Sequence, residues 1–384
     1  MSAVSCPSTR KDLHGMRIAS FNVENLFSRV RAMNLETWSE GEVVLAEYSH
    51  LNTILQKPVY SEADKQAILA AVERLGLNQD DDSEFVILRQ NRGRLLKRPP
   101  SGPPEVVAEG RDDWIGWVEL KTEAVDEVAV EMTAKVIQDV NADVLAVVEA
   151  EDRTALRRFN EQLLKPIGAP YRGIMLIDGN DERGIDVGLL TRPEYTLESI
   201  VSHVDDMENG HRIFSRDCPE FTVRVGETMR VLLLVNHLKS KGFGSKAESD
   251  ARRKAQAKRV REIYDLRRSQ GIDMIAVVGD FNDTPNSGPL QPLLSEGSDL
   301  QDISAHPQFQ SDGRPGTFGN GNKGDKIDYI LLSPALSERV TSGGVWRKGV
   351  WGGKHGTLFP HYDEMKKPVH AASDHAAIWA DIDL

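Results

Sequence analysis

The chain has 384 residues, of which 40% are hydrophobic, so it can bury a sizeable core. Its 47 basic and 59 acidic residues give a formal net charge of −12, which argues against a general electrostatic grip on nucleic acid. An anionic substrate must therefore be held locally, by a metal ion or a basic patch. The two cysteines, Cys6 and Cys218, lie in no CxxC or Cys/His cluster, so we expect neither a zinc site nor a disulfide framework.

The amino terminus and the hydropathy of the chain predict its surroundings. Residues 1–15, MSAVSCPSTRKDLHG, are polar and lack the apolar core of a secretory signal. No stretch approaches the roughly 18 apolar residues that a membrane-spanning helix needs. We therefore expect a cytoplasmic protein in a reducing setting, with no membrane partner.

The first apolar run, Met16 to Phe21, leads directly into Asn22 and is short enough to be a buried strand. The segment 28–124 then separates this run from the next regular pattern. It contains a helical pattern from Glu62 to Leu77, a predicted strand pair around residues 91–93, and a Pro-rich run. A connection this long must carry structure of its own, so we interpret 28–124 as an insertion packed on one main domain that spans 1–384.

Two helical patterns follow. Val125 to Val140 has apolar residues at fourfold spacing, with Asn141 as a stop signal. Ala251 to Gln270 is a long basic segment that ends before Gly271. Its predicted buried face consists of Ala255, Ile263 and Leu266.

Each later apolar run ends at, follows or surrounds polar residues. These runs are Val144 to Val148 before Glu149, Val231 to Val235 before Asn236 and His237, Met274 to Val278 before Gly279 and Asp280, Ile327 to Leu332 around Asp328, and Ala376 to Ile382 after Asp374 and His375. Runs this short and this rich in Val, Ile and Leu are typical of buried strands. Polar residues at one strand end after another predict a single cleft lined by sheet edges.

The motif GDFND, residues 279–283, carries the first candidate catalytic residues. Asp280 and Asn282 are two residues apart, so they share a side if the extended conformation continues. The carboxylate can take a proton from water, while the carboxamide orients water or donates to a phosphoryl oxygen. The alternative is a plain Asx turn, since Asp283-Thr284-Pro285 also has turn chemistry.

The motif SDH, residues 373–375, and the motif IDY, residues 327–329, provide further candidates. Asp374 can ligate a hard cation and His375 can donate to a phosphoryl oxygen, although an isolated Asp-His pair is often a solvated turn. Asp328 interrupts an apolar strand, and a buried carboxylate needs a positive partner. A histidine oriented by Asp328 is the natural candidate.

Oxygen-bearing side chains at the strand ends predict a site for a hard cation. Mg²⁺ prefers oxygen ligands and keeps several waters. The candidate ligands are Asn22, Glu24, Glu149 and Asp374, none of which offers sulfur. For Glu149 an acidic turn is the alternative, because Glu151 and Asp152 follow it.

Basic residues near these motifs are candidates for substrate binding. In NHLKSKG, residues 236–242, His237 can donate a proton to a leaving oxygen, and Lys239 and Lys241 can hold flanking phosphates. Arg183, Arg212 and the segment from Arg252 to Arg261 can do the same. The alternatives are a basic surface loop for the lysines and a solvated helix face for 252–261.

The segment GNDERGIDVGLLTR (179–192), and NHLKSKG followed by RRKAQAKRV, resemble bacterial nuclease-like members of the endonuclease–exonuclease–phosphatase superfamily, in its pancreatic-deoxyribonuclease-like branch. Six motifs, in chain order, resemble those of the superfamily as a whole. They are FNVEN (21–25), DVLAVVEAE (143–151), VNHLKSKG (235–242), VVGDFND (277–283), KIDYILLS (326–333) and SDHAAI (373–378). The resemblance spans nearly the whole chain. It implies an α/β fold, namely a four-layered α/β/β/α sandwich of two packed mixed β-sheets flanked by helices. It also implies an enzyme that cleaves phosphate esters with Mg²⁺ or Mn²⁺. It gives the insertion 28–124 no role.

The resemblance also implies roles for individual residues. Glu149 is similar to the principal metal-binding glutamate, and Asn22, Glu24 and Asp374 are similar to residues around the metal. Asp280 resembles the aspartate that activates the attacking water, with Asn282 as its partner. Two histidines complete the set: His375 resembles the one that contacts the scissile phosphate, oriented by Asp328, and His237 resembles the one found in the deoxyribonuclease and sphingomyelinase branches.

Three hypotheses about function follow. The first is a metal-dependent phosphodiesterase that acts on DNA as a nuclease. The second keeps the chemistry but takes a phospholipid head group or small phosphate ester, which the net charge of −12 fits. The third is a degenerate binding module, against which the intact acidic and histidine set argues. A protein partner that binds the insertion is an additional possibility.

Overall fold

The computed structural model describes residues 15–35, 38–241, 245–295 and 297–384. The expectations for the amino terminus and for Cys6 concern residues outside these ranges. The chain divides into two compact units, the first formed by residues up to Leu26 with 126–239 and 253–384, and the second by 27–125 with 240–252. Among the described residues, none of the helices combines the length and the apolar content that a membrane-spanning helix requires.

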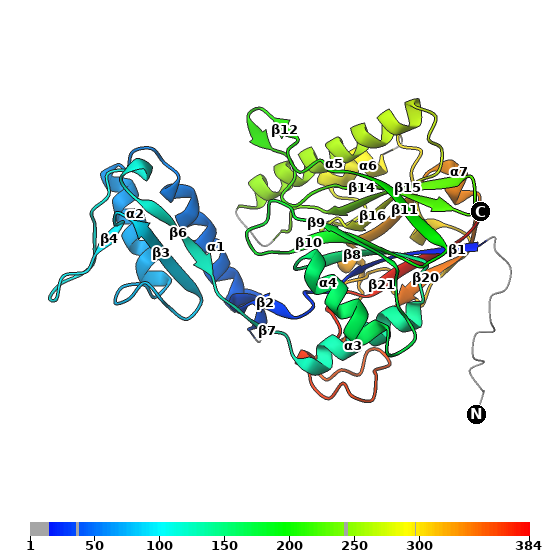
Figure 1. Ribbon diagram of the computed structural model, residues 1–384, viewed down its shortest axis with the longest axis horizontal. Helices are drawn as coiled ribbons and strands as arrows, with labels where there is room; N and C mark the ends of the chain where they lie inside the picture. The colour runs from blue at the N-terminus through cyan, green and yellow to red at the C-terminus, as the bar shows by residue number, and fades with distance from the viewer. Residues whose placement is uncertain (1–14, 36–37, 242–244, 296) are drawn as a thin grey trace. The chain divides into compact units, whose positions relative to one another are not determined.

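Two large mixed sheets form the first unit (Figure 1). The seven-stranded sheet has the order β18 (Phe309–Gln310), β20 (Val340–Trp346), β21 (Ala377–Asp383), β1 (Gly15–Asn22), β8 (Val144–Ala150), β10 (Asp186–Thr191) and β9 (Gly173–Ile177). The six-stranded sheet has the order β11 (Tyr195–Val201), β14 (Glu220–Val225), β15 (Met229–His237), β16 (Ile275–Asp280), β19 (Asp328–Leu332) and β17 (Gln301–Asp302). All six predicted core strands are therefore present.

The two sheets pack face to face through alternating apolar side chains. Ile18, Val144 and Ile378 of the seven-stranded sheet share one buried cluster with Leu233 and Ala276 of the six-stranded sheet. Helices cover the outer faces. Figure 1 shows α3 (Glu127–Val140) and α4 (Arg153–Phe159) beside the seven-stranded sheet, and α5 (Lys246–Ser269) along the six-stranded sheet. The result is the predicted four-layered α/β/β/α sandwich.

Helix α3 begins and ends close to the predicted positions, whereas α5 begins at Lys246, five residues before the predicted Ala251. The side chain of Asp126 caps the first turn of α3, and Asn141 ends the helix in the left-handed conformation. The predicted buried face of α5 is partly wrong. Leu266 is 50% exposed, because the face that packs on the sheet is rotated to Ala257, Val260, Ile263 and Tyr264. Short helices α6 (Gln291–Leu294) and α7 (Pro334–Ser337), and the hairpin of β12 (Met207–Glu208) and β13 (His211–Arg212), complete the unit.

The second unit has a hydrophobic core of its own. Helices α1 (Trp38–Leu55) and α2 (Glu62–Arg74) pack with the antiparallel pair β3 (Val86–Arg92) and β6 (Ile115–Leu120) around residues such as Leu51, Ile68 and Trp114. Two smaller pairs join β2 (Ser28–Val30) to β7 (Thr122–Ala124), and β4 (Leu96–Lys97) to β5 (Glu105–Val106).

The predicted strand pair around residues 91–93 is wrong in its partner. Strand β3 ends there but pairs with β6, across the Pro-rich segment, instead of with the strand that follows it. The physical reason is burial, because Leu88 and Val118 lie opposite each other in this pairing and both point into the core of the second unit.

Candidate active site

The polar strand ends meet at one edge of the two sheets. Strands β1 and β8 are parallel, with Asn22 opposite Val148, so Glu149 emerges beside the end of β1. In the other sheet, β15 and β16 are parallel with His237 opposite Asp280, and the antiparallel β19 places Asp328 on the other side of Asp280. The strand Cα register therefore brings His237, Asp280 and Asp328 into one row.

Backbone strain is concentrated at this edge. Glu24, Glu149 and Asn282 have φ angles of 51°, 64° and 55°, which non-glycine residues rarely adopt. Hydrogen bonds hold them there: Glu24 N donates to Asn22 Oδ1 at 3.0 Å, and Asn282 N donates to Asp280 Oδ1 at 2.8 Å. Gly279 is needed for the same reason, because at its φ of 129° a Cβ atom would lie 1.9 Å from the carbonyl oxygen of Asn236. Strained residues held in place by hydrogen bonds are typical of functional sites.

His375 is oriented by a buried carboxylate. Its Nδ1 lies 2.9 Å from Asp328 Oδ2, which also accepts a hydrogen bond from the Thr317 hydroxyl at 2.6 Å. The ring of Phe318 packs on the imidazole, with centroids 5.0 Å apart. On the other side, Ser373 Oγ accepts from His375 N at 2.9 Å. The Nε2 atom is thereby turned toward the acidic cluster.

Asp280 lies at the centre of the site. Its Oδ2 accepts from Asn22 Nδ2 at 3.3 Å and from Asn282 Nδ2 at 3.2 Å, and lies 4.0 Å from His375 Nε2. The second contact of Asn282 Nδ2 is the carbonyl oxygen of Leu238 at 3.1 Å. Asn282 therefore orients Asp280, although the backbone between the two residues is not extended.

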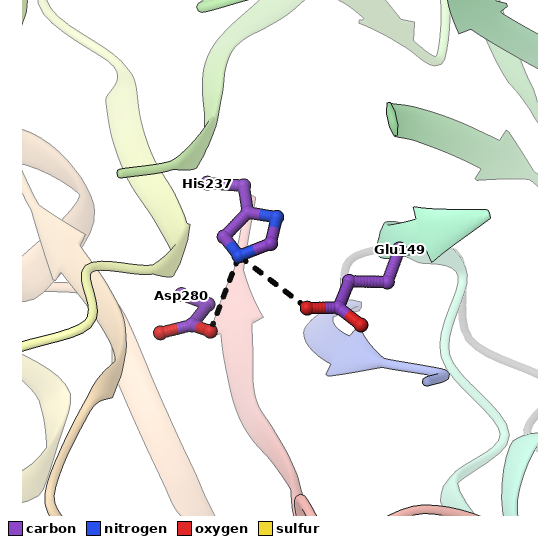
Figure 2. Close-up of side chains that lie close together, drawn as sticks. All are labelled: Glu149, His237 and Asp280. Carbon is purple, nitrogen blue, oxygen red and sulfur yellow. Dashed lines mark ion pairs between the residues drawn. The ribbon is translucent and has the colours of Figure 1, made fainter. Parts of the chain in front are cut away.

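Glu149, His237 and Asp280 converge in a second group, shown in Figure 2. His237 Nε2 lies 3.4 Å from Glu149 Oε1 and 3.6 Å from Asp280 Oδ2. One ligand atom from each of the three lies within 4.8 Å of the others. Two carboxylates this close, at one buried edge, suit a divalent cation that prefers oxygen ligands.

The other two predicted ligands, Glu24 and Asp374, contact each other through the backbone. Asp374 N donates to Glu24 Oε2 at 3.0 Å, and Asp374 Oδ1 lies 3.7 Å from His375 Nε2. Among the described residues, neither belongs to the groups of three that could hold a metal ion. Asp374 nevertheless precedes His375 of one group in sequence, and Glu24 is joined to Asp374 by this hydrogen bond.

Burial and neighbouring charges shift the acid–base properties of the site. Burial, together with the charge of Asp328, raises the pKa of Asp280 to about 7. Burial also lowers the pKa of His237 well below its usual value, and the cations of Arg216 and Arg183 add to this shift. For His375 burial alone would lower the pKa, but the carboxylates of Asp328, Asp374 and Asp280 outweigh it and raise the pKa well above its usual value. Burial thus favours the neutral form of His237, whereas the surrounding carboxylates favour the protonated form of His375.

The predicted substrate-binding cations have different environments. Arg183 pairs with Asp181 at 2.7 Å and is about 10% exposed, whereas Arg212 is exposed and pairs with Asp205 at 3.0 Å. Lys239 is half-buried, and Lys241 is exposed and belongs to the second unit.

Within the basic segment 252–261, the expected surface role is wrong for Arg253. Its side chain is fully buried and pairs with Asp283 at 2.9 Å. The packed face of α5 includes this position, so Arg253 connects the helix to the GDFND loop instead of facing solvent.

Sequence reasoning missed two residues that support the site. Thr317 lies outside every motif and is revealed only by its contact with Asp328. Arg216 is 1% exposed, and its Nη1 donates to the Leu238 carbonyl oxygen at 3.3 Å. The one available signal was the charged pair Arg216-Asp217 between apolar stretches, because charges in such a context must be paired.

The geometry defines a class of protein, a hydrolase whose buried acids and histidines converge at the edge of an α/β/β/α sandwich. The model of the Endonuclease/Exonuclease/phosphatase family matches residues 130–375, which is more than half of the chain, and the chain therefore belongs to that family. Members are metal-dependent phosphoester hydrolases, and this chain is an enzyme of that kind. The binding-module hypothesis is thus set aside.

Solved structures with similar folds include three examples. They are mannosyl-6-phosphatase Bt3783 of Bacteroides thetaiotaomicron VPI-5482 (17% identity, 65% of this chain and 88% of that chain, TM-score 0.48), truncated Caenorhabditis elegans TDP2 (16%, 67%, 91%, 0.47) and the catalytic domain of human Nocturnin (18%, 67%, 87%, 0.46). No curated protein sequence matches the chain significantly. Similarities at this level do not indicate the substrate.

Proposed function

We propose that the chain hydrolyses phosphodiester bonds with the help of a divalent cation, and that DNA is its substrate. The observation that carries the proposal is the convergence of Asp280 with the His375–Asp328 pair: Asp280 Oδ2 lies 4.0 Å from a histidine whose other nitrogen is held by a carboxylate. Attack of water on a phosphoryl group is helped by a base that accepts the proton of the water and by a positively charged donor that binds a phosphoryl oxygen.

Each residue can be given a role in this reaction. Asp280 accepts the proton of the attacking water, and Asn282 and Asn22 hold its carboxylate in place. Protonated His375 donates from Nε2 to a phosphoryl oxygen, while Asp328 fixes the ring. The lowered pKa of His237 favours a neutral imidazole, which supports a hydrogen-bonding role at the leaving oxygen over that of a general acid.

The acidic cluster fits a divalent cation such as Mg²⁺ or Mn²⁺. Glu149 would hold it beside the proposed base Asp280, with Asn22, Glu24 and Asp374 as further oxygen donors close by. The cation would neutralise charge on the phosphoryl group. It would also offset the charge of Asp328, which adds to the effect of burial in raising the pKa of Asp280.

DNA is supported by the basic loop after β15, in which Lys239 and Lys241 follow the motif NHL that contains His237. A second candidate, a phospholipid head group or small phosphate ester, is favoured by a different observation. The cations of α5 are largely engaged within the fold, for example Arg259 with Asp206 at 2.7 Å and Arg267 with Glu220 at 2.6 Å. Such a helix presents little net positive charge to a polyanion.

One experiment separates these substrates. Purified protein with Mg²⁺ or Mn²⁺ is offered plasmid, linear and single-stranded DNA, RNA, a chromogenic phosphodiester and a phosphomonoester. DNA cleavage that weakens steeply with salt supports the proposal. Turnover of small esters without DNA cleavage would transfer the assignment to the second candidate.

A double variant tests the proposed role of the lysines. Lys239→Ala with Lys241→Ala should raise KM on DNA and flatten the salt dependence, yet leave hydrolysis of the chromogenic diester nearly unchanged, because a minimal diester has no flanking phosphates. Equal losses on both substrates would contradict the role in substrate binding and indicate lysines in the chemical step.

The segment 28–124 is proposed to shape substrate access or to bind a partner protein, and not to take part in the chemistry. It contains none of the predicted site residues. Among the described residues of 27–125, none of the buried side chains is ionised at neutral pH, and the buried polar groups of Tyr60 and Trp114 bond to each other. A cytoplasmic location stays a prediction from the sequence.

A further inference from the structure

A buried cluster of two arginines and one aspartate lies beside the site. Asp181 Oδ1 accepts from Arg183 Nε at 2.8 Å, and Asp181 Oδ2 lies 2.9 Å from Arg216 Nε. The exposed fractions of the Arg216, Arg183 and Asp181 side chains are 1%, 10% and 11%. Two guanidinium groups share the carboxylate of Asp181, and the carboxylates of Glu149 and Asp280 also act on Arg216. Burying charged side chains costs desolvation free energy. Well-packed apolar side chains in their place would often stabilise the fold as well or better.

The guanidinium of Arg216 is linked to the proposed base by a short series of hydrogen bonds. Its Nη1 donates to the Leu238 carbonyl oxygen at 3.3 Å. The same oxygen accepts from Asn282 Nδ2 at 3.1 Å, and Asn282 Nδ2 also donates to Asp280 Oδ2 at 3.2 Å. Leu238 N in turn donates to the Asp280 carbonyl oxygen at 2.9 Å. Leu238 thus joins the arginine cluster to the GDFND loop.

This link bears on a strained residue. Asn282 adopts a φ of 55°, which persists only when surrounding contacts over-determine it. The Leu238 carbonyl oxygen is one of those contacts, and Arg216 fixes where that oxygen points. Asn282 loses part of its support if the oxygen can move, and the Asp280 carboxylate is then free to rotate.

We propose that Arg216 is a positioning residue for phosphoester hydrolysis: through the carbonyl oxygen of Leu238 it holds Asn282, and through Asn282 it holds Asp280 in the orientation that accepts the proton. The inference rests on the proposed role of Asp280 as the base. It does not depend on whether the substrate is DNA or a small ester, because the link ends at Asp280 and not at the leaving group.

A double-mutant cycle tests the link. Arg216→Met, Asn282→Ala and the double variant are compared with wild type on a chromogenic diester with saturating Mg²⁺. Each single variant should lower kcat roughly 10- to 100-fold with KM within about twofold, because a small misplacement of a catalytic group costs this much in rate. The double variant should be little worse than the more impaired single variant, because both substitutions break the same link.

Controls separate positioning from stability. Arg267→Met also removes an arginine from a buried carboxylate, Glu220, which is 2% exposed. It should lower the thermal midpoint but keep kcat within about twofold of wild type, since the side chain of Glu220 bonds to His203 and Arg267, which lie outside the catalytic motifs. Arg216→Lys keeps the charge but loses the forked geometry, so it should be intermediate in kcat, and it replaces Arg216→Met in the cycle if the latter does not fold.

Two results would overturn the inference: a kcat for Arg216→Met within twofold of wild type, or losses in the double variant that equal the product of the single losses. Either result would leave the proposed function intact. If the wild-type protein cleaves no diester, it is the proposed function that fails. The same double-mutant cycle is then measured on a phosphomonoester that the wild-type protein cleaves, and that result decides the role of Arg216.

Discussion

The sheet edge of the first unit and the core of the second unit handle polar side chains in opposite ways. At the sheet edge, Asp280, Asp328 and His375 are all buried, and one ligand atom from each lies within 4.8 Å of the others. In the second unit the ion pairs, such as Arg89 with Glu119, lie on the surface, and the core is apolar. Surface pairs contribute roughly 0–1 kcal/mol, whereas buried charges destabilise the fold unless they are paired. Buried carboxylates and imidazoles therefore mark the sheet edge as the candidate active site and are not part of the core of the second unit in the described chain.

Removing the divalent cation should have the largest effect, because it leaves the carboxylates of the sheet edge without their counter-charge. EDTA should abolish turnover, and Mg²⁺ or Mn²⁺ should restore it. Metal content and rate would be measured together during the titration. Full activity in metal-free buffer would contradict the proposed metal site. The sheet edge of the first unit would then lack the cation that is proposed to set it apart from the second unit.

Substitution of the central base should have the next largest effect. Asp280→Asn should lower kcat by roughly a hundredfold or more, and His375→Ala by a comparable factor, without loss of folding. Steady-state kinetics on the true substrate, with circular dichroism as the folding control, would measure this. A near-wild-type rate for either variant would refute its assigned role.

The pH dependence of kcat should be bell-shaped. Asp280 must be ionised to accept a proton, so the rate should rise as the pH passes through its pKa, which is about 7 before a cation binds and lower afterwards. His375 must be protonated, so the rate should fall as the pH passes through its raised pKa. Asp328→Asn removes the main cause of that raised pKa and should move the alkaline limb to lower pH. An unchanged alkaline limb in this variant would contradict the pairing of Asp328 with His375.

The smallest effect on chemistry should come from the second unit. Trp114 is 2% exposed in its core, so Trp114→Ala should destabilise that unit by about 3–5 kcal/mol. Because the unit has a separate core, kcat on the minimal diester should stay within about twofold of wild type below the melting transition. A loss of kcat that matches that of Asp280→Asn would show that the second unit takes part in the chemistry.

The contrast between the units also explains what could be predicted. The strands that end at Asn22, Glu149, His237 and Asp280 were evident in the sequence, because a buried strand must be apolar and its polar end residues then stand out. The helix from Glu127 to Val140 was evident from its period and its stop residue. The inserted segment was recognised by its length, but its pairing of β3 with β6 was not, because strand partners far apart in sequence leave no local signal.

By itself, the sequence determined which residue types stand at the strand ends and hence the class of chemistry. Only the tertiary structure decided which of them meet: that Asp328 holds His375, that Arg253 is buried against Asp283, and that Arg216 is linked to Asn282. The physical reason is that periodicity and turn chemistry are local, whereas the packing of two sheets brings together residues hundreds of positions apart, and charge pairing depends on that packing.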